Sequence, residues 1–275
     1  MHARHRAVMR EALALRDAGR LYPRDDAELD DQFRGSIDRF VLIATALEGR
    51  RRVLDIGSGR GLLPALLTFL GHDCHCVDYR DRRATFPEVV RGIPFHACNV
   101  EVEALPYPSG TFDGVTCCQV LEHFSHSHLP AVREMHRVLK PGGVLEIDVP
   151  NVACFRNRWR LLRGRNITWD YREHYLYAEP VLEHGRSFYP VRHNREFTAD
   201  ELALLLAEAG FRTAEVSYLK SRRWRPGIRR VISLGSALRD TVPGLRKSLI
   251  AFAVKGERTG VFRGHDALAR GWQTA

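Results

Sequence analysis

A short apolar strand that runs directly into a glycine-rich turn constrains the fold of this 275-residue chain more than any other feature. Residues 52–56 form the strand pattern, residues 57–61 read Gly-Ser-Gly-Arg-Gly, and an apolar helix pattern follows over 62–70 until Gly71 ends it. Glycines let the backbone turn sharply and approach a ligand closely, and the N-terminus of the next helix offers free N–H groups. The pattern therefore predicts a nucleotide-type ligand at the end of a buried strand.

The spacing around this turn argues against a dinucleotide. The dinucleotide fingerprint G-x-G-x-x-G needs a glycine at position 62, which is Leu62, and Asp55 at the strand end would repel a pyrophosphate. Asp78 ends the next strand pattern and is placed to accept both hydroxyls of a ribose. Asn99 follows the third strand and offers hydrogen bonds to an adenine edge. Together these residues indicate an adenosine-containing ligand with a cationic amino-acid end.

Strand and helix patterns alternate through the middle of the chain. After 52–56, strands are expected over 74–78, 95–98, 114–118 and 144–149, with a helix over 129–139 that Lys140-Pro-Gly-Gly breaks. Thr198-Ala-Asp-Glu201 is a capping box that opens a helix ending before Gly210, and two last strands are expected over 213–219 and 248–254. This order predicts an α/β fold with a parallel sheet covered by helices on both faces.

The same patterns divide the chain into segments. Residues 1–49 are expected to form N-terminal helices, over about 4–19 and 27–48, and residues 50–257 the ligand-binding domain. Within that domain, residues 151–197 are rich in Arg, Tyr and Trp and are expected to form a cap over an acceptor. Residues 220–247 are a basic insertion, and residues 258–275 a C-terminal tail.

The net charge of +9 is concentrated in the basic insertion, which carries nine Lys or Arg residues and one Asp. Such a segment suits phosphate, nucleic acid or a lipid surface, although a solvated amphipathic element explains it equally well. Ile228, Val231, Gly235 and Leu238 fall on one helical face, which allows a peripheral membrane contact, core packing or a homodimer interface. No RNA-binding module is recognisable, so a nucleic-acid acceptor is not expected.

Nothing in the sequence directs the chain to a membrane-spanning or secreted state. No run of about 18 apolar residues is present, and the first residues lack the apolar core of a signal peptide. The six cysteines lie mostly in apolar, strand-like runs and are interpreted as reduced core residues. We expect a cytoplasmic protein.

Several further motifs carry a resemblance to a known family. Residues 105–116 read Leu-Pro-Tyr-Pro-Ser-Gly-Thr-Phe-Asp-Gly-Val-Thr and continue to Leu-Glu-His at 121–123. Residues 137–143 read Arg-Val-Leu-Lys-Pro-Gly-Gly, and residues 193–198 His-Asn-Arg-Glu-Phe-Thr. Together with residues 53–61, these motifs resemble the class I S-adenosylmethionine (SAM)-dependent methyltransferases, in the subfamily that includes ubiquinone-biosynthesis and saccharide O-methyltransferases. The resemblance spans about residues 50–215 and implies a Rossmann-like sheet of seven strands with SAM as cofactor.

The resemblance also assigns cofactor contacts. It places one group of residues along the methionine end of SAM, Asp78 on the ribose, and others at the adenine and the sulfonium. The methionine group is Asp55, Gly57, Ser58, Gly59 and Gly61; Tyr79, Asn99, Val100 and Glu101 are expected at the adenine, and Gln119 under the sulfonium. Asn99 replaces the usual aspartate but keeps a hydrogen-bond donor and acceptor. Gln119 replaces the glutamate of metal-assisted relatives, so one ligand of a Mg²⁺ or Zn²⁺ site would be neutral; a divalent metal such as Mg²⁺ stays an open alternative.

Glu122 and His123 follow the fourth strand, at the edge where open α/β sheets place their sites. Because an imidazole titrates near neutrality, His123 is the predicted general base, with Glu122 orienting it or helping to hold a metal ion. His193 is the second candidate. A zinc site that adds His126 and His128 lacks an established spacing, and these two are interpreted as solvated loop residues.

The acceptor is the least constrained part of the prediction. The Asn/Asp-Pro-Pro-Tyr motif of amino-directed methyltransferases does not follow the fourth strand, so an oxygen acceptor is favoured. The aromatic and arginine-rich stretch Trp159–Tyr189 suits a sugar, because rings stack on aromatic faces and arginine donates to hydroxyls. We expect O-methylation of a saccharide, glycan or glycolipid precursor. The alternatives are a phenolic, quinone or polyketide-type molecule, or a non-catalytic SAM-fold subunit.

Overall fold

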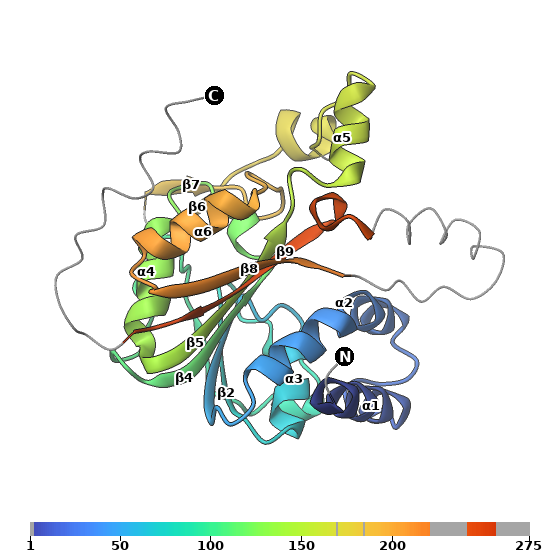
Figure 1. Cartoon of the computed structure of the whole chain (residues 1–275), viewed down its shortest axis with the longest axis vertical. Helices are drawn as coiled ribbons and strands as arrows, with labels where there is room; N and C mark the ends of the chain where they lie inside the picture. Colours follow the sequence, from blue (N-terminus) through green and yellow to red (C-terminus); the bar gives the residue numbers. More distant parts are fainter. Residues whose placement is uncertain (1–2, 169, 184, 221–240, 257–275) are drawn as a thin grey trace.

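A computed structural model describes residues 3–168, 170–183, 185–220 and 241–256, and its centre is a twisted seven-stranded sheet (Figure 1). The strand order is β3-β2-β1-β4-β5-β9-β8. The strands are β1 (Arg52–Ile56), β2 (Asp73–Asp78), β3 (Phe95–Ala97), β4 (Phe112–Cys118), β5 (Leu139–Pro150), β8 (Thr213–Leu219) and β9 (Ser248–Val254). The order reverses between β1 and β4, which is the point at which open α/β sheets bind ligands. The predicted Rossmann-like fold with seven strands is confirmed.

Helices cover both faces of the sheet (Figure 1). On one face, α4 (Leu129–Val138) and α6 (Ala199–Glu208) bury apolar side chains such as Met135 and Leu206 against β4, β5 and β9. The other face is covered by α1 (Ala3–Asp17), α2 (Ala27–Ala46) and α3 (Leu62–Phe69). The predicted capping box is present, since Thr198 and Glu201 exchange side-chain and backbone hydrogen bonds at the start of α6.

The N-terminal helices share the core of the sheet. Phe33 and Phe40 of α2 belong to the same buried cluster as Val53 of β1 and Leu66 of α3. Asp26 begins α2 by accepting a hydrogen bond from the backbone N–H of Leu29, which satisfies one of the free donors of the first turn. Segment 1–49 is therefore built into one face of the molecule.

Two details of the sheet differ from the sequence-based expectation. Strand β5 begins at Leu139, immediately after α4, and continues through the Lys140–Gly143 stretch that we expected to be a break; the pairing register with β4 shifts there, between Phe112 and Gly114. Strand β9 runs antiparallel to both β5 and β8, so the sheet is mixed. Apolar alternation reports burial but carries no information about strand direction, which is why the antiparallel pairing of β9 escaped prediction.

The expected cap is an excursion between β5 and α6. It contains α5 (Phe155–Leu162), a π-helical turn η4 (Arg172–Leu176) and a hairpin of β6 (Val181–Glu183) and β7 (Arg186–Phe188). In Figure 1, α5 projects from the top of the molecule, away from the sheet. Most of the predicted basic insertion, including its Ile228–Leu238 stripe, and the predicted tail 258–275 lie outside the described residues.

The cysteines and the helices agree with two further expectations. All six cysteines are free, and five of them are buried, as predicted for a reduced core. Among the helices that the structure describes, none combines the length and the apolar character that a bilayer crossing requires.

Candidate active site

The glycine turn adopts a backbone that only glycine accepts easily. Gly57, Gly59 and Gly61 have φ values of +73°, +54° and +75°, in the left-handed region. A Cβ atom on Gly57 would lie 2.3 Å from Cγ2 of Val120, and one on Gly61 would lie 2.9 Å from the ring of Phe86. The turn is therefore packed so closely that its own backbone forms the floor of the site.

Two buried aspartates stand beside this turn. Asp78 accepts a hydrogen bond from the Gly59 N–H at 3.0 Å, and burial raises its pKa. Asp55 accepts a hydrogen bond from the Thr116 hydroxyl at 2.6 Å, and burial raises its pKa to about 7. Asp78 thus faces the ligand side of the sheet edge, whereas Asp55 is enclosed between β1 and β4.

A pocket of about 270 Å³ opens at the carboxyl ends of β1, β2 and β4. Of the eleven residues predicted to contact the cofactor, eight line it: Gly57, Gly59, Asp78, Tyr79, Asn99, Val100, Glu101 and Gln119. Asp55, Ser58 and Gly61 are buried and are not among the lining residues. His123 lines the same pocket, so the predicted base and the predicted cofactor contacts share one cavity.

The cap supplies pocket residues that the sequence analysis missed. Val181, Glu183, Phe188 and Pro190 line the pocket from the β6–β7 hairpin and the chain after it. Glu183 accepts a hydrogen bond from the Asn99 side-chain amide at 2.8 Å, which ties the hairpin to the predicted adenine contact. The two residues are separated by 84 positions in the chain, and no local pattern signals such a contact.

Two histidines of the loop after β4, which we expected to be solvated, are only partly exposed and have partners within the protein. His126 lies 2.6 Å from Oε1 of Glu101 through its ring Nδ1, and its backbone N–H donates to the same oxygen. His128 stacks on Phe124, and its Nε2 donates to the carbonyl of Leu121 at 3.0 Å. Both side chains therefore fix the loop that carries His123.

Gln119 is held in an unusual conformation at the end of β4. Its φ of +53° is the one left-handed value among the described residues other than glycine. Its side-chain amide donates to Oδ1 of Asp148 at 2.6 Å, and the same oxygen accepts from Arg39 of α2 at 2.8 Å. A backbone hydrogen bond from Gln119 N–H to the Asp148 carbonyl adds a third restraint. The sequence offers no sign that Arg39, 109 positions from Asp148, reaches this point.

The ring of His123 is oriented by a backbone carbonyl. Its Nδ1 lies 3.0 Å from the carbonyl oxygen of Arg192, and because a carbonyl can only accept, Nδ1 carries the hydrogen. Nε2 therefore holds the lone pair. Burial, with a smaller effect of His193, lowers the pKa of His123, which keeps the ring neutral near pH 7. This arrangement corrects the expectation that Glu122 orients His123.

Glu122 itself has a fully buried carboxyl group. Neither of its two oxygens has a hydrogen-bond partner among the residues that the structure describes. Burial raises its pKa to about 8, so the group is largely protonated at neutral pH. Glu122 is not among the residues that line the pocket, so its carboxyl group lies beside the pocket and not in it.

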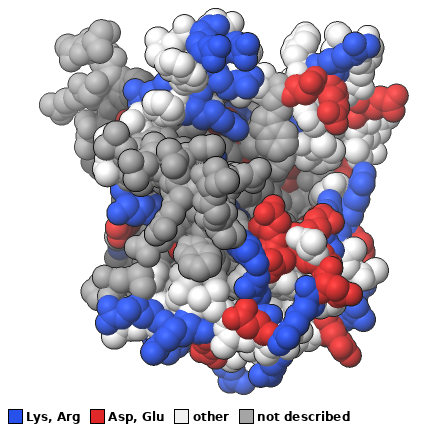
Figure 2. Space-filling model, turned by 90° about the vertical axis from the view of Figure 1, so that its right-hand side faces the viewer, with Lys and Arg blue, Asp and Glu red and all other residues white. Residues whose placement is uncertain are grey.

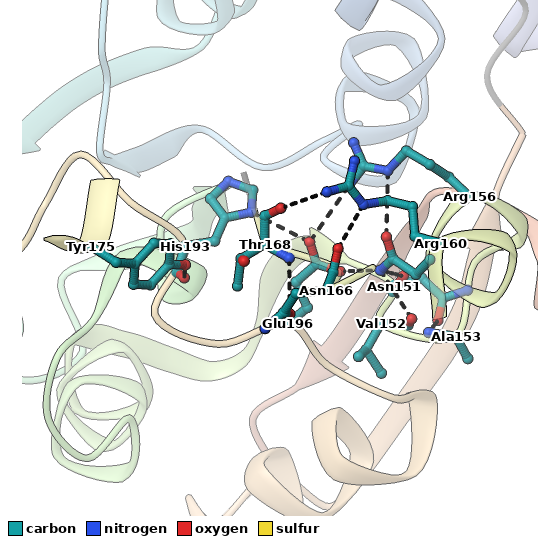
Figure 3. Close-up of polar contacts among 11 residues, drawn as sticks. Asn151, Val152, Ala153, Arg156, Arg160, Asn166, Thr168, Tyr175, His193 and Glu196 are labelled. Atoms are coloured by element: carbon teal, nitrogen blue, oxygen red, sulfur yellow. Dashed lines mark hydrogen bonds and ion pairs between the residues drawn. The ribbon is translucent and has the colours of Figure 1, made fainter. Parts of the chain in front are cut away.

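A second acid, which the sequence analysis missed, stands behind His193 (Figure 3). Oε1 of Glu196 lies 3.6 Å from Nδ1 of His193, and its Oε2 accepts from the amide of Asn157 in α5 at 2.5 Å. The rings of His193 and His123 meet edge to face, with centroids 5.0 Å apart. The cap helix is therefore connected to the predicted base through Glu196 and His193.

Glu122, His123 and His193 each offer one ligand atom, and these atoms lie within 4.8 Å of one another. Two imidazole nitrogens and one carboxylate form a donor set typical of zinc-like ions, whereas Mg²⁺ prefers oxygen ligands and retains water. Gln119 directs its side chain to Asp148 rather than adding an oxygen to this set. These residues do not fit a magnesium ion.

The glycine turn, the ribose-type acid at the end of β2 and the strand order define a class I SAM-dependent methyltransferase. Residues 27–216 match the family described as "Methyltransferase domain", and the chain belongs to this family.

Among curated relatives, the chain is 33% identical over 123 residues to a ubiquinone biosynthesis O-methyltransferase of Xanthomonas campestris pv. campestris. That match covers 41% of the chain and 48% of the relative, so the chain spans about half the length of the first curated relatives it matches. A ubiquinone/menaquinone biosynthesis C-methyltransferase of Pseudomonas fluorescens is 32% identical over 194 residues, which is 63% of the chain and 70% of the relative.

Solved structures show the same fold. The 1,6-didemethyltoxoflavin-N1-methyltransferase of Burkholderia thailandensis, with bound 1,6-didemethyltoxoflavin and S-adenosylhomocysteine, has a TM-score of 0.51 and 22% identity, covering 94% of the chain and 92% of that structure. A SAM-dependent methyltransferase of Archaeoglobus fulgidus has a TM-score of 0.52 and 19% identity, covering 82% and 98% respectively. At these identities the likeness concerns the fold alone.

Proposed function

We propose that this chain transfers a methyl group from SAM to a hydroxyl oxygen of a small molecule, with His123 as the general base. One observation carries the proposal: His123 lines the same pocket as Asp78 and Gln119 while its Nδ1 donates to Arg192. This leaves the basic Nε2 to receive a proton next to the predicted cofactor site. Asp78 would hold the ribose hydroxyls, and Asn99 the adenine.

When bound, SAM supplies a methyl carbon on a positively charged sulfur, which keeps the electron pair of the broken carbon–sulfur bond. The work of the protein is to align the acceptor and to take its proton. Nε2 of His123 removes the hydroxyl proton as the oxygen bonds to the methyl carbon.

Two acceptor classes remain as proposals. A phenolic or quinol-type hydroxyl is favoured by the apolar side chains that line the pocket around His123, which are Val120, Phe124, Phe188 and Pro190. The relatives named for ubiquinone biosynthesis support the same class. A saccharide hydroxyl, the acceptor expected from the sequence, is favoured by an arginine and an aromatic ring in the segment that holds His123: the carbonyl of Arg192 accepts from His123, and the guanidinium of Arg192 lies 3.8 Å from the ring centroid of Tyr189.

The test is methyl transfer to matched panels of phenols and saccharides, with His123→Ala as the variant. We expect transfer to a phenol, a fall in kcat of about 10²–10⁴-fold in the variant, and an unchanged dissociation constant for SAM. Because burial lowers the pKa of His123, the acid limb of the kcat/KM profile should have its midpoint below about 6.5 and should vanish in the variant.

Three outcomes would count against the proposal. If the variant keeps most of kcat, His123 is not the base. Transfer to saccharides alone would reverse the choice of acceptor. SAM binding without transfer to any acceptor would favour a non-catalytic binding subunit.

A further inference from the structure

Helix α5 buries one polar side chain, Asn157, against the protein and exposes large apolar side chains to solvent, unlike an ordinary surface helix. The fully buried Asn157 donates to the Val152 carbonyl at 3.0 Å and to Glu196 at 2.5 Å. Phe155, Trp159 and Leu162 follow at i, i+4 and i+7 on the opposite face, and they are 46%, 52% and 81% exposed. The hydrogen bonds of Asn157 therefore hold α5 in an orientation in which this apolar stripe faces solvent.

This stripe belongs to a larger concentration of exposed apolar side chains. Of the thirteen large apolar residues that are exposed in the described part of the chain, nine lie between 155 and 191. They are Phe155, Trp159, Leu161, Leu162, Tyr171, Leu176, Tyr177, Leu182 and Val191. Exposed apolar side chains that gather in one region mark an interaction site, whereas single ones are ordinary.

The same helix is strongly basic. Residues 151–168 contain five arginines and no lysine or acid. Within the described ranges, only Arg156 of these five lies within 4 Å of a carboxylate, that of Glu196 at 3.8 Å. Arg158 and Arg160 donate instead to uncharged backbone carbonyls, so their charge is not neutralised. In Figure 2, blue and white side chains lie together at the top of the molecule, the end from which α5 projects in Figure 1.

We propose that the outward side of α5 and the loop after it, here called the cap surface (residues 155, 158, 159 and 161–165), binds the face of an anionic lipid bilayer. Tryptophan and leucine side chains insert at the level of the headgroups, while arginines pair with lipid phosphates. Residues 166–180 connect the cap surface to the β6–β7 hairpin, from which Val181, Glu183 and Phe188 line the pocket.

Charge argues against other occupants. Residues 221–240 contain six arginines and one aspartate, so their net charge has the same sign as the cap surface. A second copy of the chain would likewise bring five arginines against five. A nucleic acid would satisfy the arginines but would leave Leu161 and Leu162 without apolar partners. A bilayer surface with anionic headgroups satisfies both kinds of side chain.

Flotation of the full chain with vesicles tests the proposal, with neither SAM nor an acceptor present, so its outcome does not depend on the proposed function. The vesicles are phosphatidylcholine alone or phosphatidylcholine mixed with phosphatidylglycerol. The test variants are Trp159→Ser/Leu162→Ser and Arg163→Gln/Arg165→Gln. The control is Leu204→Ser, which alters an exposed leucine of α6, and unchanged thermal midpoints verify folding.

We expect binding to the mixed vesicles, weakened by salt, and a fall in the partition coefficient of about tenfold or more in each test variant. The control should bind like the wild type. The proposal is wrong if the wild type does not bind, if it binds both vesicles equally, or if both test variants bind normally, which would assign lipid binding to another segment. If duplex DNA displaces the chain from the vesicles at a concentration lower than that of the lipid, the proposal is overturned in favour of nucleic acid.

Discussion

The carboxyl group of Glu122 is fully buried, so its charged form is unfavourable. Because its pKa is about 8 in the folded protein and about 4.5 in the unfolded chain, the folded state binds more protons between these two values. The free energy of unfolding therefore falls as the pH rises through this window, by about 1.4 kcal/mol per pH unit from this group. The carboxyl group thus lowers stability at neutral pH, which is common for residues kept for function.

Replacing Glu122 with glutamine should remove this cost, because the amide has a similar shape and no charge. We expect the variant to have a higher thermal midpoint than the wild type at pH 8 and little difference at pH 5. Thermal unfolding across this range measures it, and Glu208→Gln, an exposed position, is the control. A constant difference between wild type and variant at every pH would show that Glu122 is not protonated in the folded state.

Local and long-range features of the active site differ in how well the sequence predicts them. The glycine turn and the acid of Asp78 are encoded by neighbouring residues, and Gly57, Gly59 and Asp78 line one pocket. Glu183, Glu196 and Arg39 act through partners 84, 39 and 109 positions away. Such contacts depend on how a cap folds back on a sheet, which hydrophobic periodicity does not report.

At the scale of elements, the turn between β1 and α3 restricts most strongly which residues the sequence can carry. Gly57→Ala combines a left-handed φ with a Cβ atom 2.3 Å from Val120. The turn would have to move, so we expect the dissociation constant for SAM to rise at least about tenfold, because 1.4 kcal/mol of strain already has that effect. Isothermal titration measures it.

Gly71→Ala provides the matched control. Gly71 has a φ of +91° and no atom within 4 Å of an added Cβ. An alanine at this position therefore has an unfavourable left-handed φ but no steric clash. It lies at the end of α3, away from the pocket. If both variants bind SAM like the wild type, the turn does not form the cofactor site.

Helix α2 contributes to the same site through Arg39. Its guanidinium pairs with Asp148, which has a fully buried side chain and also holds Gln119. Arg39→Met would leave that carboxylate uncompensated, at a cost of about 3–5 kcal/mol in unfolding free energy. We expect weaker SAM binding as well, since Gln119 would lose a fixed partner. Chemical denaturation and titration measure the two effects.

Arg34→Met is the control for this variant. Arg34 lies on the same helix and pairs with Asp30 at 2.6 Å, but its side chain is 47% exposed. Exposed pairs contribute about 0–1 kcal/mol, so a small effect is expected. Equal losses in the two variants would mean that α2 is destabilised in general and that Arg39 has no particular role at the site.

At the scale of the molecule, the two faces of the sheet are covered by different parts of the chain. Helices from within the β–α alternation, α4 and α6, cover one face, while the N-terminal helices complete the other together with α3. The alternation predicted the sheet and the position of its ligand edge, because both follow from the order of elements. The sequence patterns did not indicate that residues 1–49 would share that core, since an amphipathic stripe does not specify its partner.

Removal of residues 1–49 should therefore expose one face of the sheet. We expect the shortened chain to aggregate or to unfold without a cooperative transition, because Phe33, Phe40 and Leu47 would no longer cover Val53 and Leu66. Phe33→Ala in the full chain provides a milder form of the test and should cost about 3–5 kcal/mol, whereas Leu13→Ala, an exposed position of α1, should cost little. Denaturant unfolding measures each cost. Cooperative unfolding of the shortened chain with unchanged SAM affinity would show instead that the sheet and the α3–α6 helices fold independently of the N-terminal helices.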